Sequence, residues 1–445
     1  MAGHFQYNQV NKIAYYEVSP KVVRANCDAV ITVKNKYITR YSQFQLQGVY
    51  FVLVCPMLDF EVKQNNTVEQ TPVLVEADND ELTFTHHFEG EQDYMLMIWR
   101  KEENGEKNLL LTTYLYALEE DLYSLTPLKG NTHLHSCYSD GLEEPLQHIG
   151  AALKSGFDYI ALTDHNNYEG SVSARDFLDK LREVDIDKRL TVLNGEEFSC
   201  NFQPMHIISL GAEQAVPKKY YEIKDIPTFE TDEEKLRWIV EKIGELCTCI
   251  RENGGVSVLC HPYWKPIFDW VRLDAPRRLI DESIQSGAFD AFEVVGGSPK
   301  GQSIIPQEQH LLALECMKLA PKPYAFLGQS DSHIVNADDS TCVFGTHYTI
   351  AFCRENSARA ILDAVKDCQT VAVEETDGRC EYFGSLRLVN FCRYLEKEYF
   401  PKAKAAQEFY HRVFELCATG KQAEGKALSD TLKEITLYSY EDLKK

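Results

Sequence analysis

The chain has 445 residues, of which 44% are hydrophobic, and its 46 Lys+Arg against 68 Asp+Glu give a net charge of -22. This length and composition predict two or three domains with substantial apolar cores. The acidic balance disfavours a non-specific nucleic-acid binder, which needs a basic surface, and a protein that binds anionic membranes. A small molecule, even an anionic one, stays the expected partner, because a local metal cluster can outweigh the global charge.

The N-terminal residues and the cysteines indicate a cytoplasmic protein. No charged leader followed by an apolar segment is visible, and no run of about 18 apolar residues could span a bilayer. The 14 cysteines are scattered and irregularly spaced, which is typical of reduced thiols rather than of a disulfide framework. We therefore expect a protein of a reducing compartment without membrane contact.

Residues 1–126 predict a β-rich, sandwich-like domain. Segments such as 48–56 (GVYFVLVCP) and 93–100 (DYMLMIWR) are short and rich in β-branched and aromatic residues. They follow one another without intervening helical patterns, which favours an antiparallel sandwich. Pro127 and Gly130 mark the end of this pattern.

Residues 127–380 alternate between strand and helix patterns. Apolar segments such as 255–262 (GVSVLCHP) are separated by amphipathic stretches such as 231–253. This alternation favours an α/β fold with a parallel barrel or a doubly wound sheet. Residues 381–445 predict a helical C-terminal extension that either packs on the barrel or mediates homo-oligomerisation.

Residues able to bind a metal ion gather where the predicted strands end. His133 and His135 are two positions apart, so they share one face of a strand. In a (β/α) barrel, active sites are built from the C-terminal ends of the strands and the loops that follow them. His206 instead begins a strand and would reach the site if residues 200–205 turn back. The other residues at strand ends are Asp140, Asp164, His165, Glu196, Glu197, His261, Asp331 and His333.

Imidazole and carboxylate groups without thiolate indicate zinc, manganese or iron. The candidate ligands exceed what one ion binds, so we expect two or three divalent ions, with Glu197 as a carboxylate able to bridge two of them. A single histidine at a strand end is more often a core residue than a ligand, but here the coincidence recurs at five strand ends. Of the remaining histidines, only His347 is placed to approach this site.

Five ordered motifs carry a family resemblance: HLHSCYSDG, LTDHN, GEEFS, CHP and SDSH. Together they resemble the PHP (polymerase and histidinol phosphatase) superfamily of metal-dependent hydrolases over residues 128–375. The run YALEEDLYSLTPLKGNTHLHS, with a β-rich domain ahead of it, resembles the CehA/McbA branch of that superfamily. The resemblance implies a distorted (β/α)7 barrel with a bi- or trinuclear metal centre.

The resemblance also implies a role for each motif residue. One ion would be held by His133, His135, Glu197 and Asp331, a second by Glu197, His206 and His261, and a third by Asp140, His165 and His333. Behind the ligands, Asp164 would orient a ligating imidazole, and Glu196 would be a supporting or strand-facing acid. One departure is visible, because Asn131 stands where the family usually has aspartate.

These features predict a metal-dependent phosphoesterase that hydrolyses a small phosphorylated molecule. Two ions lower the pKa of a shared water and so provide hydroxide near neutral pH. His165 or His333 would protonate the leaving group, and Glu197 and Asp331 complete the catalytic set by holding the ions. The candidate substrate-binding residues are Lys265 and Lys300.

Four other functions are compatible with parts of this pattern. A PHP-type hydrolase of a carbonyl substrate (carbamate, amide or ester) keeps the ions and changes the electrophile. A non-catalytic, metal-stabilised binding module would be marked by lost ligands, whereas all nine positions are filled. An amidohydrolase-type barrel gives no role to Asp140 or His165, and a DNA-editing exonuclease disagrees with the acidic composition.

Overall fold

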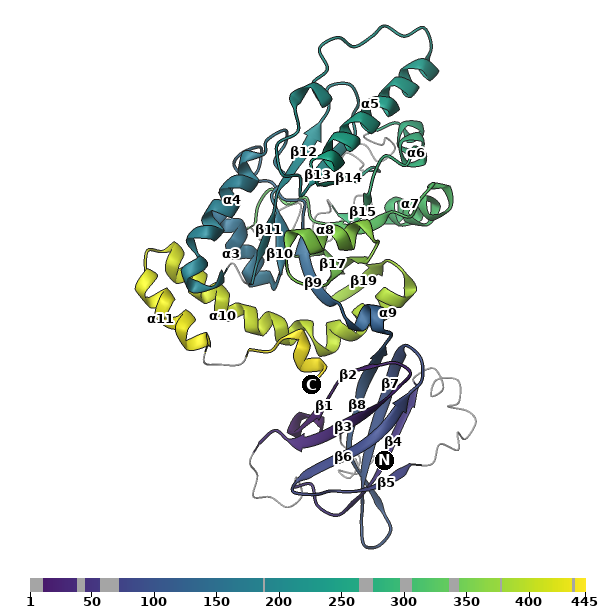
Figure 1. Ribbon diagram of the computed structural model, residues 1–445, viewed down its shortest axis with the longest axis vertical. Coiled ribbons are helices and arrows are strands. Elements are labelled where there is room, and N and C mark those ends of the chain that lie inside the picture. The colour runs from purple at the N-terminus through teal and green to yellow at the C-terminus, as the bar shows by residue number, and fades with distance from the viewer. Residues whose placement is uncertain are drawn as a thin grey trace, which may run out of the picture. The chain divides into compact units, whose positions relative to one another are not determined.

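The computed structural model divides the chain into two compact units, residues 1–125 with 438–445 and residues 126–437 (Figure 1). Within the described residues, no helix is both long and apolar enough to cross a membrane. The described residues are 11–37, 45–56, 72–186, 189–263, 275–296, 306–335, 344–376, 378–433 and 437–445.

The first unit contains two β-sheets. Hydrogen bonds order the strands of one sheet β1-β3-β6 and those of the other β2-β8-β7-β4-β5. The β2–β8 pair is parallel and the other described pairs are antiparallel. The strands are β1 (Tyr16–Ser19), β2 (Val22–Arg24), β3 (Cys27–Asn35), β4 (Val49–Pro56), β5 (Val73–Glu76), β6 (Glu81–Phe88), β7 (Gln92–Lys101) and β8 (Lys107–Leu118). The short helices are η2 (Ile13–Tyr15), α2 (Glu120–Tyr123) and η7 (Tyr440–Leu443).

Alternating side chains build the core of the first unit. In β4, Tyr50, Val52 and Val54 are buried at every second position, and in β6 so are Leu82 and Phe84. Successive side chains of a strand point to opposite faces, so each sheet presents one apolar face. The two apolar faces share one buried cluster, which is the packing of a sandwich.

The last residues of the chain complete the first unit. Tyr440 and Leu443 are buried, and the Leu443 carbonyl accepts a hydrogen bond from the Lys21 N–H at 2.7 Å. The Lys444 ammonium lies 5.0 Å from the centre of the Tyr123 ring. This return of the chain was not predicted from the sequence.

Replacing Leu443 with alanine should destabilise the first unit by about 3 kcal/mol, because it leaves a cavity at a fully buried position. The measurement is the midpoint of the thermal unfolding transition of this unit in the full chain. Leu74→Ala is the matched control, since Leu74 is 55% exposed in β5 and its loss should change stability by less than about 0.5 kcal/mol. Equal midpoints for the two variants would show that residues 438–445 do not contribute to the core.

The second unit contains two further sheets and the helices that cover them. The strand orders are β11-β10-β9-β17-β18-β19 and β12-β13-β14-β15-β16. The strands are β9 (Thr126–Asn131), β10 (Tyr159–Ala161), β11 (Thr191–Leu193), β12 (Gly195–Ser199), β13 (His206–Leu210), β14 (Val256–Leu259), β15 (Ala291–Gly296), β16 (Ala325–Gln329), β17 (His347–Cys353), β18 (Thr370–Thr376) and β19 (Arg379–Phe383). The helices are α3 (Pro145–Ser155), α4 (Glu169–Lys180), η4 (Arg182–Val184), η6 (Lys218–Tyr220), α5 (Asp232–Glu252), α6 (Arg277–Gln285), α7 (Pro306–Leu319), α8 (Ala358–Lys366), α9 (Leu386–Glu398), α10 (Phe400–Ala418) and α11 (Gln422–Lys433).

Both sheets of the second unit are mixed. Strands β9, β10 and β11 run parallel, as do β14, β15 and β16. The pairs β12–β13, β13–β14, β9–β17, β17–β18 and β18–β19 are antiparallel. Residues 200–205 are too few for a crossover, so β12 and β13 form a hairpin. The predicted α/β class is confirmed, whereas these sheets do not establish a (β/α)7 barrel.

The interior of the second unit lies between its two sheets. Apolar side chains of both sheets and of α8 form one buried cluster, which includes Leu128, Tyr159, Ile208, Val258, Leu327 and Ile361. Two isolated bridges join the motifs in this unit. Leu134 pairs with Ser332 beyond the ends of β9 and β16, and His165, beyond the end of β10, pairs with Glu197 of β12. Since the bridging residues belong to the predicted motifs, the motifs meet at one end of this interior.

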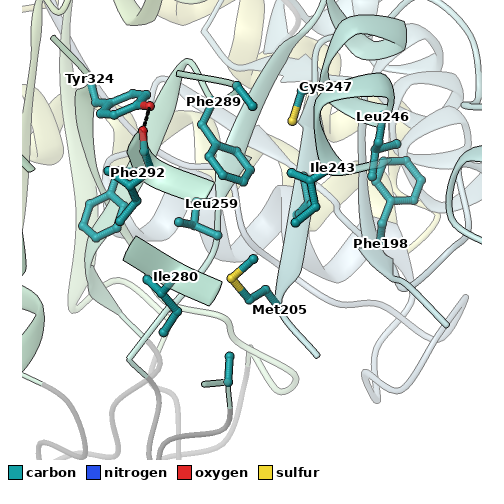
Figure 2. Packing of buried hydrophobic residues seen from close by; sticks show 14 of the residues in the cluster. Phe198, Met205, Ile243, Leu246, Cys247, Leu259, Ile280, Phe289, Phe292 and Tyr324 are labelled. Atoms are coloured by element: carbon teal, nitrogen blue, oxygen red, sulfur yellow. Dashed lines mark hydrogen bonds between the residues drawn. The ribbon is translucent and has the colours of Figure 1, made fainter. Parts of the chain in front are cut away.

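A second apolar cluster packs between the five-stranded sheet and helices α5 and α6. Figure 2 shows Phe198 of β12 and Leu259 of β14 among side chains that include Ile243 of α5. Because Phe198 faces this outer cluster, its neighbour Glu197 faces the interior. The strand partner of Glu197 is Ile208, which indeed lies in the interior cluster.

Helix α10 packs beside α3 (Figure 1) and reaches a buried carboxyl group. Gln407 of α10 donates from Nε2 to Asp158 Oδ1 at 2.9 Å. Asp158 Oδ2 accepts from the Lys129 N–H of β9, also at 2.9 Å. Burial raises the pKa of Asp158 to about 7, so the fold favours the neutral form of this group.

Replacing Asp158 with asparagine should remove a pH-dependent loss of stability. A carboxyl whose pKa is raised on folding stabilises the fold below its unfolded pKa of about 4, and this contribution is lost as the pH rises through about 7. Asparagine carries no charge, and its amide can donate to Gln407 Oε1, which has no hydrogen-bond partner among the described residues. From about pH 5 to about pH 8.5, the free energy of unfolding of the unsubstituted protein should fall by about 2 kcal/mol relative to the variant in denaturant titrations. Parallel pH profiles would contradict this.

Candidate metal centre

All nine predicted ligands lie where the motifs meet. N···O distances of 2.9 to 3.9 Å connect them through the carboxylates of Asp140, Glu197 and Asp331. They come from β12 (Glu197), from β13 (His206), and from the segments that follow β9 (His133, His135, Asp140), β10 (His165), β14 (His261) and β16 (Asp331, His333).

The innermost group consists of His133, His135, Glu197 and Asp331. Each histidine Nε2 lies 3.1 or 3.2 Å from Glu197 Oε2 and from Asp331 Oδ1. Within the described residues, however, neither Nε2 has a hydrogen-bond partner. Buried polar atoms are rarely left unsatisfied. The Asp331 oxygen and three atoms that lack such a partner (His133 Nε2, His135 Nε2 and Glu197 Oε2) lie around one point, so they fit a cation.

Glu197 divides its two oxygens between two histidine groups. Oε1 lies 2.9 Å from His206 Nδ1 and 3.4 Å from His261 Nε2. The histidines near Oε2, at 3.1 to 3.2 Å, are His133, His135 and His165. In the part of the chain that the structure describes, neither oxygen has a hydrogen-bond partner. A buried carboxylate with this geometry is suited to bridge two ions.

A third group lies nearer the solvent. Asp140 Oδ2 is 3.3 Å from His333 Nε2 and 3.8 Å from His165 Nε2, and Asp140 Oδ1 is 3.5 Å from His135 Nδ1. The Asp140 side chain is 55% exposed and that of His333 35%. His165 reaches both this group and Glu197, although the resemblance placed it only in the third set. An ion held here should be the most easily lost.

Local backbone geometry brings three ligands to the centre. The hairpin pairs Ser199 with His206, so the chain turns back over residues 200–205 and returns His206 to Glu197. His261 and Asp331 follow their strands with φ angles of 22° and 51°. These positive values are uncommon for residues with a side chain and cost free energy. Both residues thus turn sharply where their side chains enter the centre.

Hydrogen bonds between the first and last motifs fix the seam between the two sheets. The Thr132 N–H donates to Gln329 Oε1, and Gln329 Nε2 donates to Thr132 Oγ1, both at 2.6 Å. The His135 N–H donates to the Ser332 carbonyl at 3.0 Å. These bonds hold the ligands that follow β9 beside those that follow β16.

Asn131 uses both ends of its amide in this seam. Nδ2 donates to Ser330 Oγ at 2.6 Å and to the His347 carbonyl at 3.3 Å, while Oδ1 accepts from the His133 N–H at 3.1 Å. Aspartate could accept but not donate, so the His347 carbonyl explains asparagine at this position. The His347 ring lies 3.5 Å from Glu374 Oε1. Among the described residues, His347 joins none of the ligand groups.

Asp164 supports the loop of residues 136–140, and among the described residues no hydrogen bond joins it directly to an imidazole. It is buried, and it accepts from the Ser136 N–H, Ser136 Oγ and Ser139 Oγ, each at 2.7 Å. It approaches a ligand through Ser139, whose Oγ lies 3.4 Å from His135 Nδ1. Gly170 makes room for this carboxylate, since a Cβ there would lie 1.9 Å from Asp164 Oδ2.

Glu196 lies on the opposite face of β12 from Glu197. Its Oε2 accepts from the Val216 N–H at 3.4 Å, and burial raises its pKa to about 7. No contact given for the described residues joins it to the ligands, so the strand-facing alternative fits it. The two lysines predicted to bind substrate, Lys265 and Lys300, lie outside the described residues.

Glu293 of β15 contacts two ligands and was not among the predicted site residues. Its Oε1 lies 2.6 Å from His133 Nδ1, and its Oε2 accepts from the His261 N–H at 2.7 Å. One feature of the sequence points to this role, because an acid stands inside the apolar strand AFEVVG. A carboxylate buried in such a strand requires a polar partner.

Burial and charge oppose each other in the centre. Burial disfavours ionisation of Glu197, but the neighbouring histidines, above all His133, hold its pKa well below the usual range. Burial alone would lower the pKa of His135, yet Asp331 and Glu197 raise it to about 10. The buried acids therefore favour positive charge at this point, and a divalent ion can supply it in place of protons.

A family comparison agrees with this geometry. Residues 131–285 match the model of the PHP domain family. The resemblance of the ordered motifs to the PHP superfamily is therefore confirmed, and the chain contains a PHP domain, which supports a metal-dependent hydrolase. The match spans the first four motifs, whereas SDSH at 330–333 lies beyond it. The closer likeness to the CehA/McbA branch stays a prediction.

Two curated proteins are similar to parts of the chain. The DNA polymerase/3'-5' exonuclease PolX of Bacillus subtilis is 31% identical over 86 residues, which make up 19% of this chain and 14% of the polymerase. An uncharacterized protein of Methanocaldococcus jannaschii is 27% identical over 148 residues, or 31% of this chain and 68% of that protein. The match therefore spans only a small part of the length of the polymerase.

Two solved structures resemble the chain more distantly. A two-domain protein of Bacteroides vulgatus, containing a predicted PHP-like metal-dependent phosphoesterase, is 19% identical with a TM-score of 0.39 over 57% of this chain and 66% of its own. An amidohydrolase of Chromobacterium violaceum is 20% identical with a TM-score of 0.32 over 48% of this chain and 89% of its own. At these TM-scores, neither structure supports an argument about substrate.

Proposed function

We propose that this protein is a metal-dependent phosphoesterase that hydrolyses a small phosphorylated molecule with two or three divalent ions. The observation that carries the proposal is Glu197, whose buried oxygens face separate histidine groups without hydrogen-bond partners among the described residues. Ions held on the two sides of Glu197 would supply Lewis-acid charge and would make hydroxide available near neutral pH.

Three sets of donors would hold the ions. The first is His133, His135, Glu197 and Asp331, the second is Glu197, His206 and His261, and the third is Asp140, His165 and His333. His165 can also serve the second set, because donor atoms of His165, Glu197 and His206 all lie within 4.8 Å of one another. The donors are imidazoles and carboxylates, which suits zinc, manganese or iron.

Partly exposed histidines would donate the proton that the leaving group needs. The side chains of His165 and His333 are partly exposed, whereas His133 and His135 are buried. A leaving group can therefore reach His165 or His333. When the third set holds no ion, one of them would protonate the leaving group as the bond breaks, because an imidazole nitrogen that binds a metal carries no proton. Glu197 and Asp331 act on the reaction by holding the ions.

A phosphoester fits these sets better than a carbonyl compound. The ligand groups share His135, His165 and Glu197, so ions in them would be neighbours and could contact several oxygens of one phosphoryl group. A carbamate, amide or ester presents a single carbonyl oxygen and would use fewer of these positions. The carbonyl substrate is therefore the second candidate.

The test is metal-resolved hydrolysis by the full chain. Bound metals are counted by elemental analysis, and turnover of p-nitrophenyl phosphate is compared with turnover of p-nitrophenyl acetate. His135→Ala removes a ligand shared by the inner and outer groups. Because His135 is buried and its loss can disturb folding, the partly exposed His333 is replaced by alanine in a second variant, and Leu74→Ala serves as the control.

Each outcome selects a function. Two or three ions per chain, with phosphate turnover that is lost in both histidine variants and kept in the control, support the phosphoesterase. Bound ions with ester turnover alone move the assignment to a carbonyl hydrolase. A chain that binds no metal contradicts both enzymes, and bound ions without turnover of either substrate leave the metal-stabilised binding module.

A further inference from the structure

We propose that Glu293 is a positioning residue that orients two metal ligands from separate segments of the chain, an inference that rests on the proposed metal centre. Its Oε1 lies 2.6 Å from His133 Nδ1, in the segment after β9. Its Oε2 accepts from the His261 N–H at 2.7 Å, in the segment after β14. A single carboxylate thus holds one ligand by its ring and the other by its backbone.

The strand pattern explains why an acid can reach both ligands. Phe292 and Val294 belong to the outer apolar cluster, whereas Ala291 belongs to the interior one. Because side chains alternate along a strand, Glu293 points with Ala291 into the interior. It is buried there, and both of its oxygens are engaged, which compensates the cost of burying the charge.

The contact with the His133 ring selects a tautomer. When Nδ1 carries the proton and donates it to Glu293, Nε2 presents a lone pair. That Nε2 lies 3.2 Å from both Glu197 Oε2 and Asp331 Oδ1, in the inner ligand group. Cys260 lies near the same pair, but 2.6 Å between Glu293 Oε1 and His133 Nδ1 leaves no room for an ion between them. This contact therefore orients the ligand and is not a separate metal site.

The contact with His261 holds a strained turn. The φ angle of His261 is 22°, a conformation that persists only where surrounding contacts favour it. The hydrogen bond from its N–H to Glu293 is such a contact. It keeps the backbone turned so that His261 Nε2 lies 3.4 Å from Glu197 Oε1.

Glu293→Gln tests the proposal with a side chain of the same shape. Glutamine has one acceptor oxygen, so either the His133 ring N–H or the His261 backbone N–H loses its acceptor. Alternatively, the new amide donates to His133 Nδ1, which places the ring proton on Nε2. We expect the affinity for zinc to fall about 10- to 100-fold in chelator competition, without substrate. Glu396→Gln is the matched control, because Glu396 accepts from the Tyr348 hydroxyl at 2.8 Å and should leave zinc affinity unchanged.

A second readout needs no variant. In the zinc-loaded, unsubstituted protein, ¹⁵N NMR of the histidine rings should show the His133 proton on Nδ1. A proton on Nε2, or equal zinc affinity in folded Glu293→Gln and unsubstituted protein, would overturn the positioning role. Failure of the unsubstituted protein to bind zinc, manganese or iron would instead overturn the proposed function, so the two failures are distinguishable.

Discussion

Replacing Glu197 with glutamine is expected to abolish the bridged pair of ions and to lower turnover by about 1000-fold or more. Glutamine keeps the volume but offers one neutral oxygen, so it cannot serve the histidines on both sides of the carboxylate. The inner set loses its central anion, and the second set loses the only carboxylate proposed for it. The measurements are the metal content per chain and kcat for the phosphoester substrate.

Glu196→Gln is the matched control for this substitution. The two glutamates are adjacent in β12 and both are buried, but Glu196 faces the Val216 N–H on the other side of the strand. We expect this variant to retain its metals. If Glu197→Gln keeps two or three ions and most of its turnover, Glu197 is not a bridging ligand and the proposed centre is wrong.

Asn131→Asp should destabilise the second unit by about 4 kcal/mol at a pH where the new carboxylate is ionised. The position is fully buried. The substitution removes the N–H groups that bond Ser330 Oγ and the His347 carbonyl, and it places negative charge against that carbonyl. The measurement is the free energy of unfolding of the metal-free protein, because a change in metal affinity would otherwise alter the measured stability.

Asn201→Asp offers a control with the same local chemistry at an exposed site. Asn201 also uses both ends of its amide, since Nδ2 donates to the Ile223 carbonyl and Oδ1 accepts from the Ile223 N–H, both at 3.0 Å. Water can solvate the new charge there, so the loss should be below about 1 kcal/mol. Equal losses of unfolding free energy in the two variants would mean that the hydrogen bonds of Asn131 stabilise the protein no more than those of an exposed asparagine.

The candidate ligands could be selected from the sequence because residue type and spacing carry their chemistry. His133 and His135 follow β9 two positions apart, and acids or histidines recur after later strands of an alternating pattern. Ends of neighbouring strands converge in such folds. The structure accordingly brings all nine residues together, including His261 beside Glu197 and His206, which depended on the turn at 200–205.

The residues that support the ligands could not be predicted in the same way. Glu293 is one of 68 acidic residues, and its role depends on β15 lying beside β14, where Leu259 pairs with Phe292. Asp164 follows a strand, as the candidate ligands do, but its oxygens accept hydrogen bonds from the hydroxyls of Ser136 and Ser139. Such contacts arise between segments far apart in the chain.

The sequence by itself determined the α/β class and the set of candidate metal donors, and therefore the kind of chemistry that we propose for them. Only the tertiary structure decided that the two oxygens of Glu197 face different histidines, that His165 reaches two groups, and that residues 438–445 close the first unit. The physical reason is the separation along the chain over which each property is set. Donor type and periodicity are local properties of the chain, whereas distances of about 3 Å between donors depend on how distant strands pack and turn.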